Sequence, residues 1–281
     1  MPLLTKNDAK GIPGWLFNLA ARLTAVDKVN ELYDSLQGND GPDFAHALLQ
    51  KLGVDYQIGN HDVLKNLPEG PFITISNHPF GSIDGIMLVD LFGHLRPDFK
   101  VMVNKFLSRI ENLNVNWITV IPNGDSDGEV KPDSIRGVKE VISNIRDGHP
   151  VGFFPSGAVS DFKFGEGIRD REWQEGVIKL IKKCRVPVVP VHFLDRNTAY
   201  FYALGLIDWR IRVSRLPGEM LNKAGKRTRI GIGDIISVEK QDSISDLKEF
   251  GKMLRDAVYS MPEPKNFILR SDAGSELFGT L

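Results

Sequence analysis

Short apolar runs alternate with longer segments of helical character through the middle of the chain. The apolar runs have the length of buried strands and fall at residues 72–75, 101–103, 117–121, 151–154 and 186–193. The helical segments fall between them, near residues 84–95, 134–147 and 171–184. Because strands that alternate with helices form parallel or mixed sheets with helices on their faces, the pattern predicts an α/β fold, with a mostly parallel or mixed sheet covered by helices.

Both ends of the chain extend this pattern. Near the N-terminus, four apolar residues recur at helical spacing in a segment that runs to about residue 36: Leu16, Leu19, Leu23 and Val26. This spacing predicts an amphipathic helix, and a second helix is expected from Asp43 to about Leu52. A late strand at 230–236 and a helix at 244–259 complete the pattern. We therefore expect an N-terminal helical extension over residues 1–66 and one α/β domain over residues 67–281.

The composition suits a folded enzyme with one main domain. A chain of 281 residues with 42% hydrophobic content can bury roughly three quarters of its unfolded surface. The net charge of −1 creates no field that attracts nucleic acid, and the sequence has no zinc-finger or basic-repeat spacing. Nucleic-acid binding is therefore not expected.

The cysteine content and the apolar runs bear on the cellular compartment. Cys184 is the single cysteine, which excludes an internal disulfide and fits a reducing cytoplasm. The sequence has no signal-like opening segment and no run of about 20 apolar residues. We expect a cytoplasmic protein that does not span a membrane.

The segment after the run at 72–75 brings a histidine and an aspartate close to a turn that contains glycine. His78 lies where the strand ends, and Asp84 precedes the next helix. This is the carboxyl edge of the sheet, where open α/β folds bind ligands. A neutral imidazole accepts a proton near pH 7, and a carboxylate on its other ring nitrogen fixes the tautomer and stabilises the imidazolium. We expect His78 to act as a general base oriented by Asp84, although a histidine in a turn is often only structural.

Metal chemistry is not expected at this place. A histidine and an aspartate alone are too few ligands, and no second cluster with metal-ligand spacing accompanies them in the sequence. The remaining histidines lack a comparable neighbour, although His192 ends a predicted strand and would lie near the same edge.

The same residues carry a family resemblance. Asn77-His78-Pro79 followed by Asp84 resembles the His-Asp motif of the glycerolipid acyltransferases, which esterify glycerol phosphate and lysophospholipids. Three further blocks resemble family motifs in the same order, between residues 70 and 193: Lys105-Phe106-Leu107, Phe153-Phe154-Pro155-Ser156-Gly157 and Val186-Pro187-Val188-Val189-Pro190-Val191.

Two departures from the family pattern stand out. Five residues separate His78 from Asp84, where the family normally has four, and we expect Gly81 to form a bulge that accommodates the extra residue. The spacing resembles that of the hemolysin-like and aminolipid acyltransferases. In the third block Ser156 replaces the family's glutamate, which we expect to alter recognition of the acceptor.

The resemblance implies an O-acyltransferase of membrane lipid biosynthesis. It would move a fatty acyl group from acyl-CoA or acyl carrier protein to a hydroxyl of a lysophospholipid, glycerol phosphate or lyso-aminolipid, with no cofactor besides this co-substrate. Backbone amides near Gly81 or Gly157 would stabilise the oxyanion. The resemblance places His78 and Asp84 in catalysis and seven residues in substrate binding: Asn77, Lys105, Pro155, Ser156, Gly157, Arg169 and Arg171. Each of these assignments has a plainer alternative. Lys105 could be a solvated lysine, Arg169 and Arg171 could be charged residues ahead of a surface helix, and Gly157 could be an ordinary turn glycine.

A basic segment predicts contact with a membrane. Residues 205–230 contain seven basic residues against two acidic ones, interleaved with Trp209 and several aliphatic residues. Arg210, Arg212 and Arg215 alternate with apolar residues, as on one face of a strand or ribbon. We expect the protein to lie on the inner face of the cell membrane. The contact would be this segment or the N-terminal helix with Trp15 and Phe17, which could equally be a core-packing helix. A solvated loop beside core aromatics is the alternative.

Two other functions remain open at this point. A hydrolase could use the same His-Asp pair to activate water on a lipid ester or thioester. A catalytically silent protein could bind lyso-lipid or acyl thioester without turnover, and the longer spacing between His78 and Asp84 would fit it. Analysis of the products separates the three.

Overall fold

A mixed sheet forms the centre of the protein, which we describe from a computed structural model covering residues 25–36, 38–120 and 132–278. The eight strands follow the order β10-β1-β9-β8-β2-β5-β3-β4. Their bounds are β1 Gln57–Gly59, β2 Ile73–Ser76, β3 Lys100–Asn104, β4 Trp117–Val120, β5 Val151–Phe153, β8 Val188–Phe193, β9 Arg229–Ile232 and β10 Phe267–Leu269. The predicted α/β fold with a mostly parallel or mixed sheet is thereby confirmed.

Most neighbouring strands run parallel. The pairs β8–β2, β2–β5, β5–β3 and β3–β4 are all parallel, so their carboxyl ends meet at one edge of the sheet. β9 runs antiparallel to β8, and β10 runs antiparallel to β1. β2 therefore ends in the middle of a parallel block, with β8 and β5 on its two sides.

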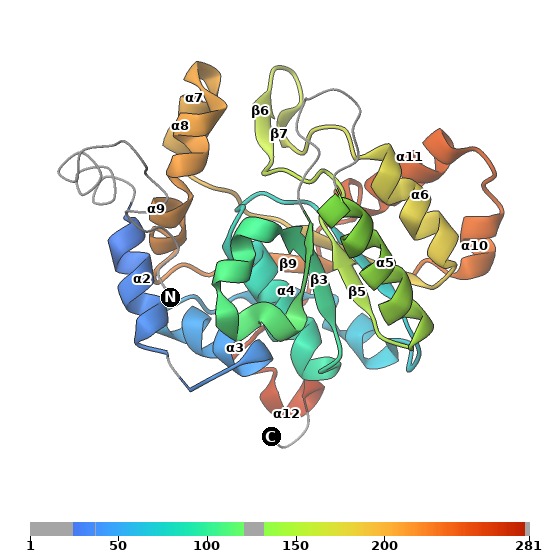
Figure 1. Ribbon diagram of the computed structural model, residues 1–281, viewed down its shortest axis with the longest axis horizontal. Helices are drawn as coiled ribbons and strands as arrows, with labels where there is room; N and C mark the ends of the chain where they lie inside the picture. Colours follow the sequence, from blue (N-terminus) through green and yellow to red (C-terminus); the bar gives the residue numbers. More distant parts are fainter. Residues whose placement is uncertain (1–24, 37, 121–131, 279–281) are drawn as a thin grey trace.

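Helices cover both faces of this sheet (Figure 1). On one face, α3 (Gly41–Lys51) packs against α4 (Ile83–Leu95), and their buried residues share a core that includes Phe44, Met87 and Phe92. On the other face lies a second core, to which α5 (Pro132–Arg146), α6 (Glu175–Cys184) and α11 (Leu247–Tyr259) contribute. Alternate residues of a strand face opposite sides of the sheet, and Ile73 and Ile75 of β2 accordingly both belong to the second core.

The loops at the carboxyl ends of the parallel strands carry further elements. These are the hairpin β6 (Asp161–Lys163) and β7 (Gly167–Arg169), then α7 (Ala199–Ile207), α8 (Trp209–Ser214) and α9 (Leu216–Leu221). Elsewhere lie α2 (Val26–Asp34), α10 (Val238–Asp242), α12 (Gly274–Leu277) and the 3₁₀ helices η2 (His61–Asn66), η3 (Lys105–Arg109) and η4 (Glu111–Asn116).

Several predicted bounds need correction. Residues 209–214 form the helix α8 and not a strand or ribbon, since Asp208 caps the helix by accepting a hydrogen bond from the Arg210 amide at 2.6 Å. The late strand ends at Ile232, and the helix predicted from residue 171 begins at Glu175. The strands β1 and β10 and the hairpin β6–β7 were not predicted.

The N-terminal region is described only in part. Of the predicted first helix, Val26–Asp34 is helical, and residues 1–24 lie outside the described residues. The second helix is confirmed as α3. The boundary at residue 66 stays a prediction, although β1 precedes it and forms part of the main sheet. Over the described ranges, no helix is both long enough and apolar enough to cross a membrane.

Candidate active site

His78 lies in the loop that joins the central strand β2 to α4, at the carboxyl edge of the parallel block. Its Nδ1 lies 2.7 Å from Oδ2 of Asp84. The Asp84 side chain is 0% exposed and the His78 side chain is 19% exposed. The imidazole is thus bound to a fully buried carboxylate and remains partly accessible from solvent.

Asp84 is held as a carboxylate by more than the histidine. Its Oδ2 also accepts hydrogen bonds from the backbone N–H groups of Phe80 and Gly81, each at 3.1 Å. Asp84 lies in the first turn of α4, where the helix dipole favours a negative charge. Burial raises the pKa of Asp84, but the imidazole and these two backbone donors outweigh burial and lower it.

The extra residue between His78 and Asp84 does not separate the pair. Gly81 has φ 72°, in the left-handed region that favours glycine, and there its N–H points to the carboxylate. A Cβ at this position would lie 2.3 Å from Cγ2 of Val159. The bulge predicted at Gly81 is confirmed, and the spacing gives no support to a catalytically silent protein.

Two further side chains hold the carbonyl groups of this turn. Asn197 donates from Nδ2 to the Phe80 carbonyl at 3.0 Å, and the Tyr202 hydroxyl donates to the Pro79 carbonyl at 3.2 Å. Both donors are buried residues. The backbone between the histidine and the aspartate is therefore fixed at its amides and its carbonyls.

A second buried carboxylate, which sequence reasoning missed, supports the backbone of His78. Oδ1 of Asp170 accepts hydrogen bonds from the His78 N–H at 3.2 Å and from the Ser160 hydroxyl at 2.5 Å. Its Oδ2 accepts one from Nε1 of Trp173 at 3.2 Å. Asp170 lies between two arginines in a charged stretch of the sequence, so no sequence signal distinguished it from a surface residue.

These surroundings set the protonation of His78. Burial by itself lowers the pKa of the imidazole. The charge of Asp84, the hydrogen bond to it and the charge of Asp170 outweigh burial and raise the pKa above its ordinary value of 6.5. The Phe154 ring stacks on the imidazole with 4.2 Å between centroids, which restricts the orientation of His78.

Other predicted site residues use their polar groups within the protein. The Asn77 side chain exchanges two hydrogen bonds with the backbone of Phe193, at 2.8 and 2.9 Å, and so joins the loop to the end of β8. The Ser156 hydroxyl is fully buried and donates to the Ala158 carbonyl at 2.8 Å. Neither side chain is directed to a substrate in this arrangement, and their role in binding stays a prediction.

The third block forms a tight turn beside the site. Pro155 is buried, and its carbonyl accepts a hydrogen bond from the Gln174 backbone at 2.9 Å. Gly157 has φ 61°, and a Cβ there would lie 2.1 Å from Nε2 of Gln174. Arg171 donates from Nε to the Ser156 carbonyl at 2.8 Å. Pro155, Gly157 and Arg171 therefore build the turn that follows β5.

The amides suggested for oxyanion binding are already engaged. Gly81 donates its N–H to Asp84, and Gly157 donates its N–H to the Phe154 carbonyl at 2.9 Å. The two glycines therefore use their own N–H groups inside their turns, and oxyanion binding by amides near them stays a prediction.

Three further residues from the sequence analysis lie near the sheet edge that carries His78: Lys105, Arg169 and His192. Their surroundings differ. Lys105 is exposed at the start of η3, directly after β3. Arg169 packs its guanidinium 5.0 Å from the centre of the Tyr259 ring. Burial and the charge of Arg169 lower the pKa of His192 to about 4, so this histidine is neutral at pH 7.

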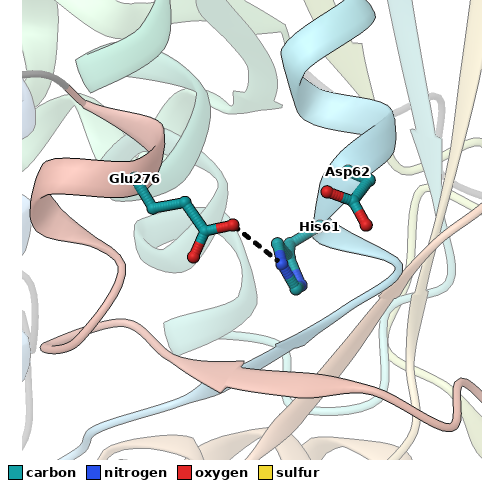
Figure 2. Close-up of side chains that lie close together, drawn as sticks. All are labelled: His61, Asp62 and Glu276. Atoms are coloured by element: carbon teal, nitrogen blue, oxygen red, sulfur yellow. Dashed lines mark ion pairs between the residues drawn. The ribbon is translucent and has the colours of Figure 1, made fainter.

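A group of possible metal ligands lies elsewhere. Figure 2 shows His61, Asp62 and Glu276, whose ligand atoms are the set close enough to share an ion among the described residues. Lys65 contacts Asp62 Oδ1 at 2.9 Å and Glu276 Oε1 at 2.8 Å, and its ammonium ion repels a second cation. The group follows β1 and lies at the opposite edge of the sheet from His78, because β1 is parallel to β9 and β9 is antiparallel to β8.

The basic segment does not form one face. Arg212 is buried and pairs with Asp161 at 2.6 Å, and Arg229 pairs with Asp195 at 3.0 Å. Arg210 lies on the exposed part of α8, beside Trp209. The second candidate for membrane contact, the predicted N-terminal helix with Trp15 and Phe17, lies outside the described residues.

Comparisons with known proteins identify the family of this chain. The chain is 27% identical over 261 residues to a lyso-glycine lipid O-acyltransferase of Phocaeicola vulgatus, covering 90% of this chain and 89% of the relative. It is 26% identical over 261 residues to a lyso-glycine lipid O-acyltransferase of Bacteroides thetaiotaomicron, covering 90% of this chain and 92% of the relative. A profile of the acyltransferase family matches residues 4–266. The protein therefore belongs to the acyltransferase family and is an O-acyltransferase of lipid metabolism.

Proposed function

We propose that this enzyme transfers a fatty acyl group from a thioester to a hydroxyl group of a lyso-lipid, with His78 as the general base. The observation that carries the proposal is the 2.7 Å contact between His78 and a fully buried Asp84 at the carboxyl edge of the sheet. With Nδ1–H donated to Asp84, the lone pair of the imidazole lies on Nε2. This nitrogen can accept the proton of an acceptor hydroxyl.

The reaction then proceeds in two proton transfers. As Nε2 of His78 takes the hydroxyl proton, the acceptor oxygen forms a bond to the thioester carbonyl carbon. When the tetrahedral intermediate collapses, the carbon–sulfur bond breaks and the imidazolium returns the proton to the leaving thiolate. The ester and a free thiol are the products, and His78 is regenerated.

The two carboxylates have separate roles in this scheme. Asp84 holds the ring in the orientation that presents Nε2, and its charge stabilises the imidazolium formed during the reaction. Asp170 binds the backbone N–H of His78 at 3.2 Å and fixes the start of the loop. General-base assistance of this kind typically contributes roughly 10²–10⁴ in rate.

The thioester donor is acyl-CoA or acyl carrier protein, and no further cofactor takes part in the scheme. For the acceptor, the names of the two relatives favour a lyso-lipid with an amino-acid head group such as glycine. A lysophospholipid and glycerol phosphate are the alternatives. Because the substrates are lipids, we place the enzyme in the cytoplasm, as a peripheral protein on the inner face of the cell membrane.

A competition experiment tests the proposal. Purified protein receives one labelled acyl thioester together with lyso-glycine lipid and lysophosphatidic acid, and mass spectrometry measures each ester. The expected result is acylated glycine lipid in at least equal amount. Preference for lysophosphatidic acid, with the glycine lipid inert, would contradict the proposed acceptor. Release of free fatty acid without any ester would identify a hydrolase and contradict the transfer itself.

A further inference from the structure

Two projections rise from the sheet edge that carries His78. In Figure 1 the helices α7 and α8 and the hairpin β6–β7 extend in the same direction beyond the body of the protein. They come from separate parts of the chain, since the hairpin follows β5 and the helices follow β8. α7 nevertheless contacts β6, so the two projections touch each other.

Both projections expose large apolar side chains. On the helices, Ile207 is 75% exposed and Trp209 is 61% exposed, and Leu206 and Ile211 are exposed beside them. On the hairpin, Phe164 is 85% exposed and Phe162 is also exposed. Single exposed apolar residues are ordinary, but a group of this size on one edge marks an interaction surface.

The sequence of α7 makes this surface unusual for a helix in water. Ala199–Ile207 contains no charged residue, and its buried residues are Phe201 and Tyr202. The rest of the helix would face solvent without the polar side chains that a surface helix normally carries. Its exposed residues are suited to an apolar neighbour.

The charges beside these apolar residues indicate the nature of that neighbour. The Arg210 guanidinium lies 5.5 Å from the Trp209 ring centre, and the Arg215 guanidinium lies 5.7 Å from that of Tyr200. Of the three arginines in residues 199–215, Arg212 is buried and paired with Asp161, so Arg210 and Arg215 are the cations beside these rings. Aromatic rings with adjacent cations are typical of the headgroup region of an anionic bilayer.

We propose that the tips of α7–α8 and of β6–β7 together dock this enzyme on an anionic phospholipid bilayer. The inference rests on the proposed function, because a lyso-lipid acceptor is dissolved in that bilayer. Ile207, Trp209 and Phe164 enter the boundary between headgroups and acyl chains, and Arg210 contacts lipid phosphates. The acceptor then reaches His78 from the membrane side, between the two projections.

A short chain of contacts joins this surface to the catalytic loop. Arg212, whose side chain is buried, pairs with Asp161 of β6 at 2.6 Å and donates to the Ser160 carbonyl at 3.3 Å. The Ser160 N–H in turn donates to the His78 carbonyl at 2.9 Å. Arg212 therefore connects the helices to the hairpin and, through Ser160, to the backbone of His78. Docking of the two projections would thus fix the distance between the imidazole and the membrane surface.

Flotation with vesicles tests the proposal without any need for turnover. The test variants are the double substitution Ile207→Ser with Trp209→Ser on the helices, and Phe164→Ser on the hairpin. Val115→Ser is the control, because Val115 is also 64% exposed but lies in η4, which leads into the amino end of β4 at the opposite edge. Thermal unfolding of each variant verifies that it is folded.

We expect wild-type protein to float with vesicles that contain phosphatidylglycerol, and less with phosphatidylcholine alone. Each test variant should lower the partition coefficient by about tenfold or more, since apolar area leaves the bilayer, while Val115→Ser retains it. Arg210→Gln should weaken the dependence on salt and on anionic lipid.

Two outcomes would overturn the proposal. One is vesicle binding by the folded test variants equal to that of the wild type. The other is a wild-type protein that does not bind vesicles but forms a dimer, with the test substitutions dissociating that dimer. In that case the surface would be a contact between two copies of the chain. Failure of the proposed function looks different: the protein would bind vesicles through this surface yet form no ester from any acceptor.

Discussion

Replacement of Gly81 by alanine tests the turn that brings His78 and Asp84 together. A residue with a Cβ at φ 72° costs about 1–2 kcal/mol relative to glycine. The new Cβ would also lie 2.3 Å from Cγ2 of Val159 and 2.9 Å from Cδ2 of Leu216. Overpacking of this kind costs typically about 1–3 kcal/mol, so Gly81→Ala should lower the free energy of unfolding by about 2–5 kcal/mol.

Gly225→Ala is the matched control for this substitution. Gly225 has φ 70°, close to that of Gly81, but a Cβ there meets nothing within 4 Å. The control should therefore lose only the conformational cost of about 1–2 kcal/mol. Denaturant unfolding of both variants isolates the contribution of the contacts with Val159 and Leu216.

The activity of the two variants should differ more than their stability. Relief of the clash moves the turn, and the Gly81 N–H then leaves Asp84 Oδ2, from which it lies 3.1 Å in the wild type. Acyl transfer by folded Gly81→Ala should fall well below that of Gly225→Ala, measured without denaturant. Equal stability of the two variants together with wild-type transfer by Gly81→Ala would refute this account of the turn.

Three other substitutions test the charges in the protein. Asp84→Asn should reduce transfer by roughly 10²–10⁴-fold without changing the preferred acceptor, because it disturbs the imidazole and not the acceptor site; unchanged turnover would contradict its role. Asp170→Asn removes a charge that raises the pKa of His78, so the acid limb of the pH–rate profile should move to lower pH; an unmoved or raised midpoint would contradict it. Asp90→Asn leaves the buried Arg270 without the carboxylate that it contacts at 3.0 Å, which should cost about 3–5 kcal/mol at pH 7. Burial raises the pKa of Asp90, but its hydrogen-bond partners outweigh burial and lower the pKa below 3.8. The difference in free energy of unfolding between Asp90→Asn and the wild type should therefore be complete above pH 3.8 and become smaller as the pH falls below that value, which acid unfolding measures.

The central strands and the catalytic loop were predictable from sequence because their signals are local. β2, β3, β4, β5 and β8 are apolar runs with turn residues at their ends, and the structure places each within about two residues of its predicted bounds. His78 and Asp84 lie on one turn, so their spacing already implied that they were close. Gly81 was singled out for the same reason, since a bulge needs a glycine nearby.

Other parts of the fold depend on contacts between distant segments. β1 and β10 are three-residue strands whose pairing partners lie far away in the sequence, so neither has a periodicity of its own. Asp170 contacts His78 across 92 positions of the chain. Around Arg210 and Arg212 the alternation of charged and apolar residues favoured a strand, but the Asp208 cap and the packing of Arg212 against Asp161 produce a helix.

Turnover by His78→Ala tests directly whether His78 is the general base of acyl transfer. The wild type and the variant receive the same labelled acyl thioester and lyso-lipid, and mass spectrometry measures the ester, with thermal unfolding to verify that the variant is folded. We expect ester from the wild type and none above background from folded His78→Ala, because no other group would remove the hydroxyl proton. Ester formation by His78→Ala at a rate near that of the wild type would contradict it.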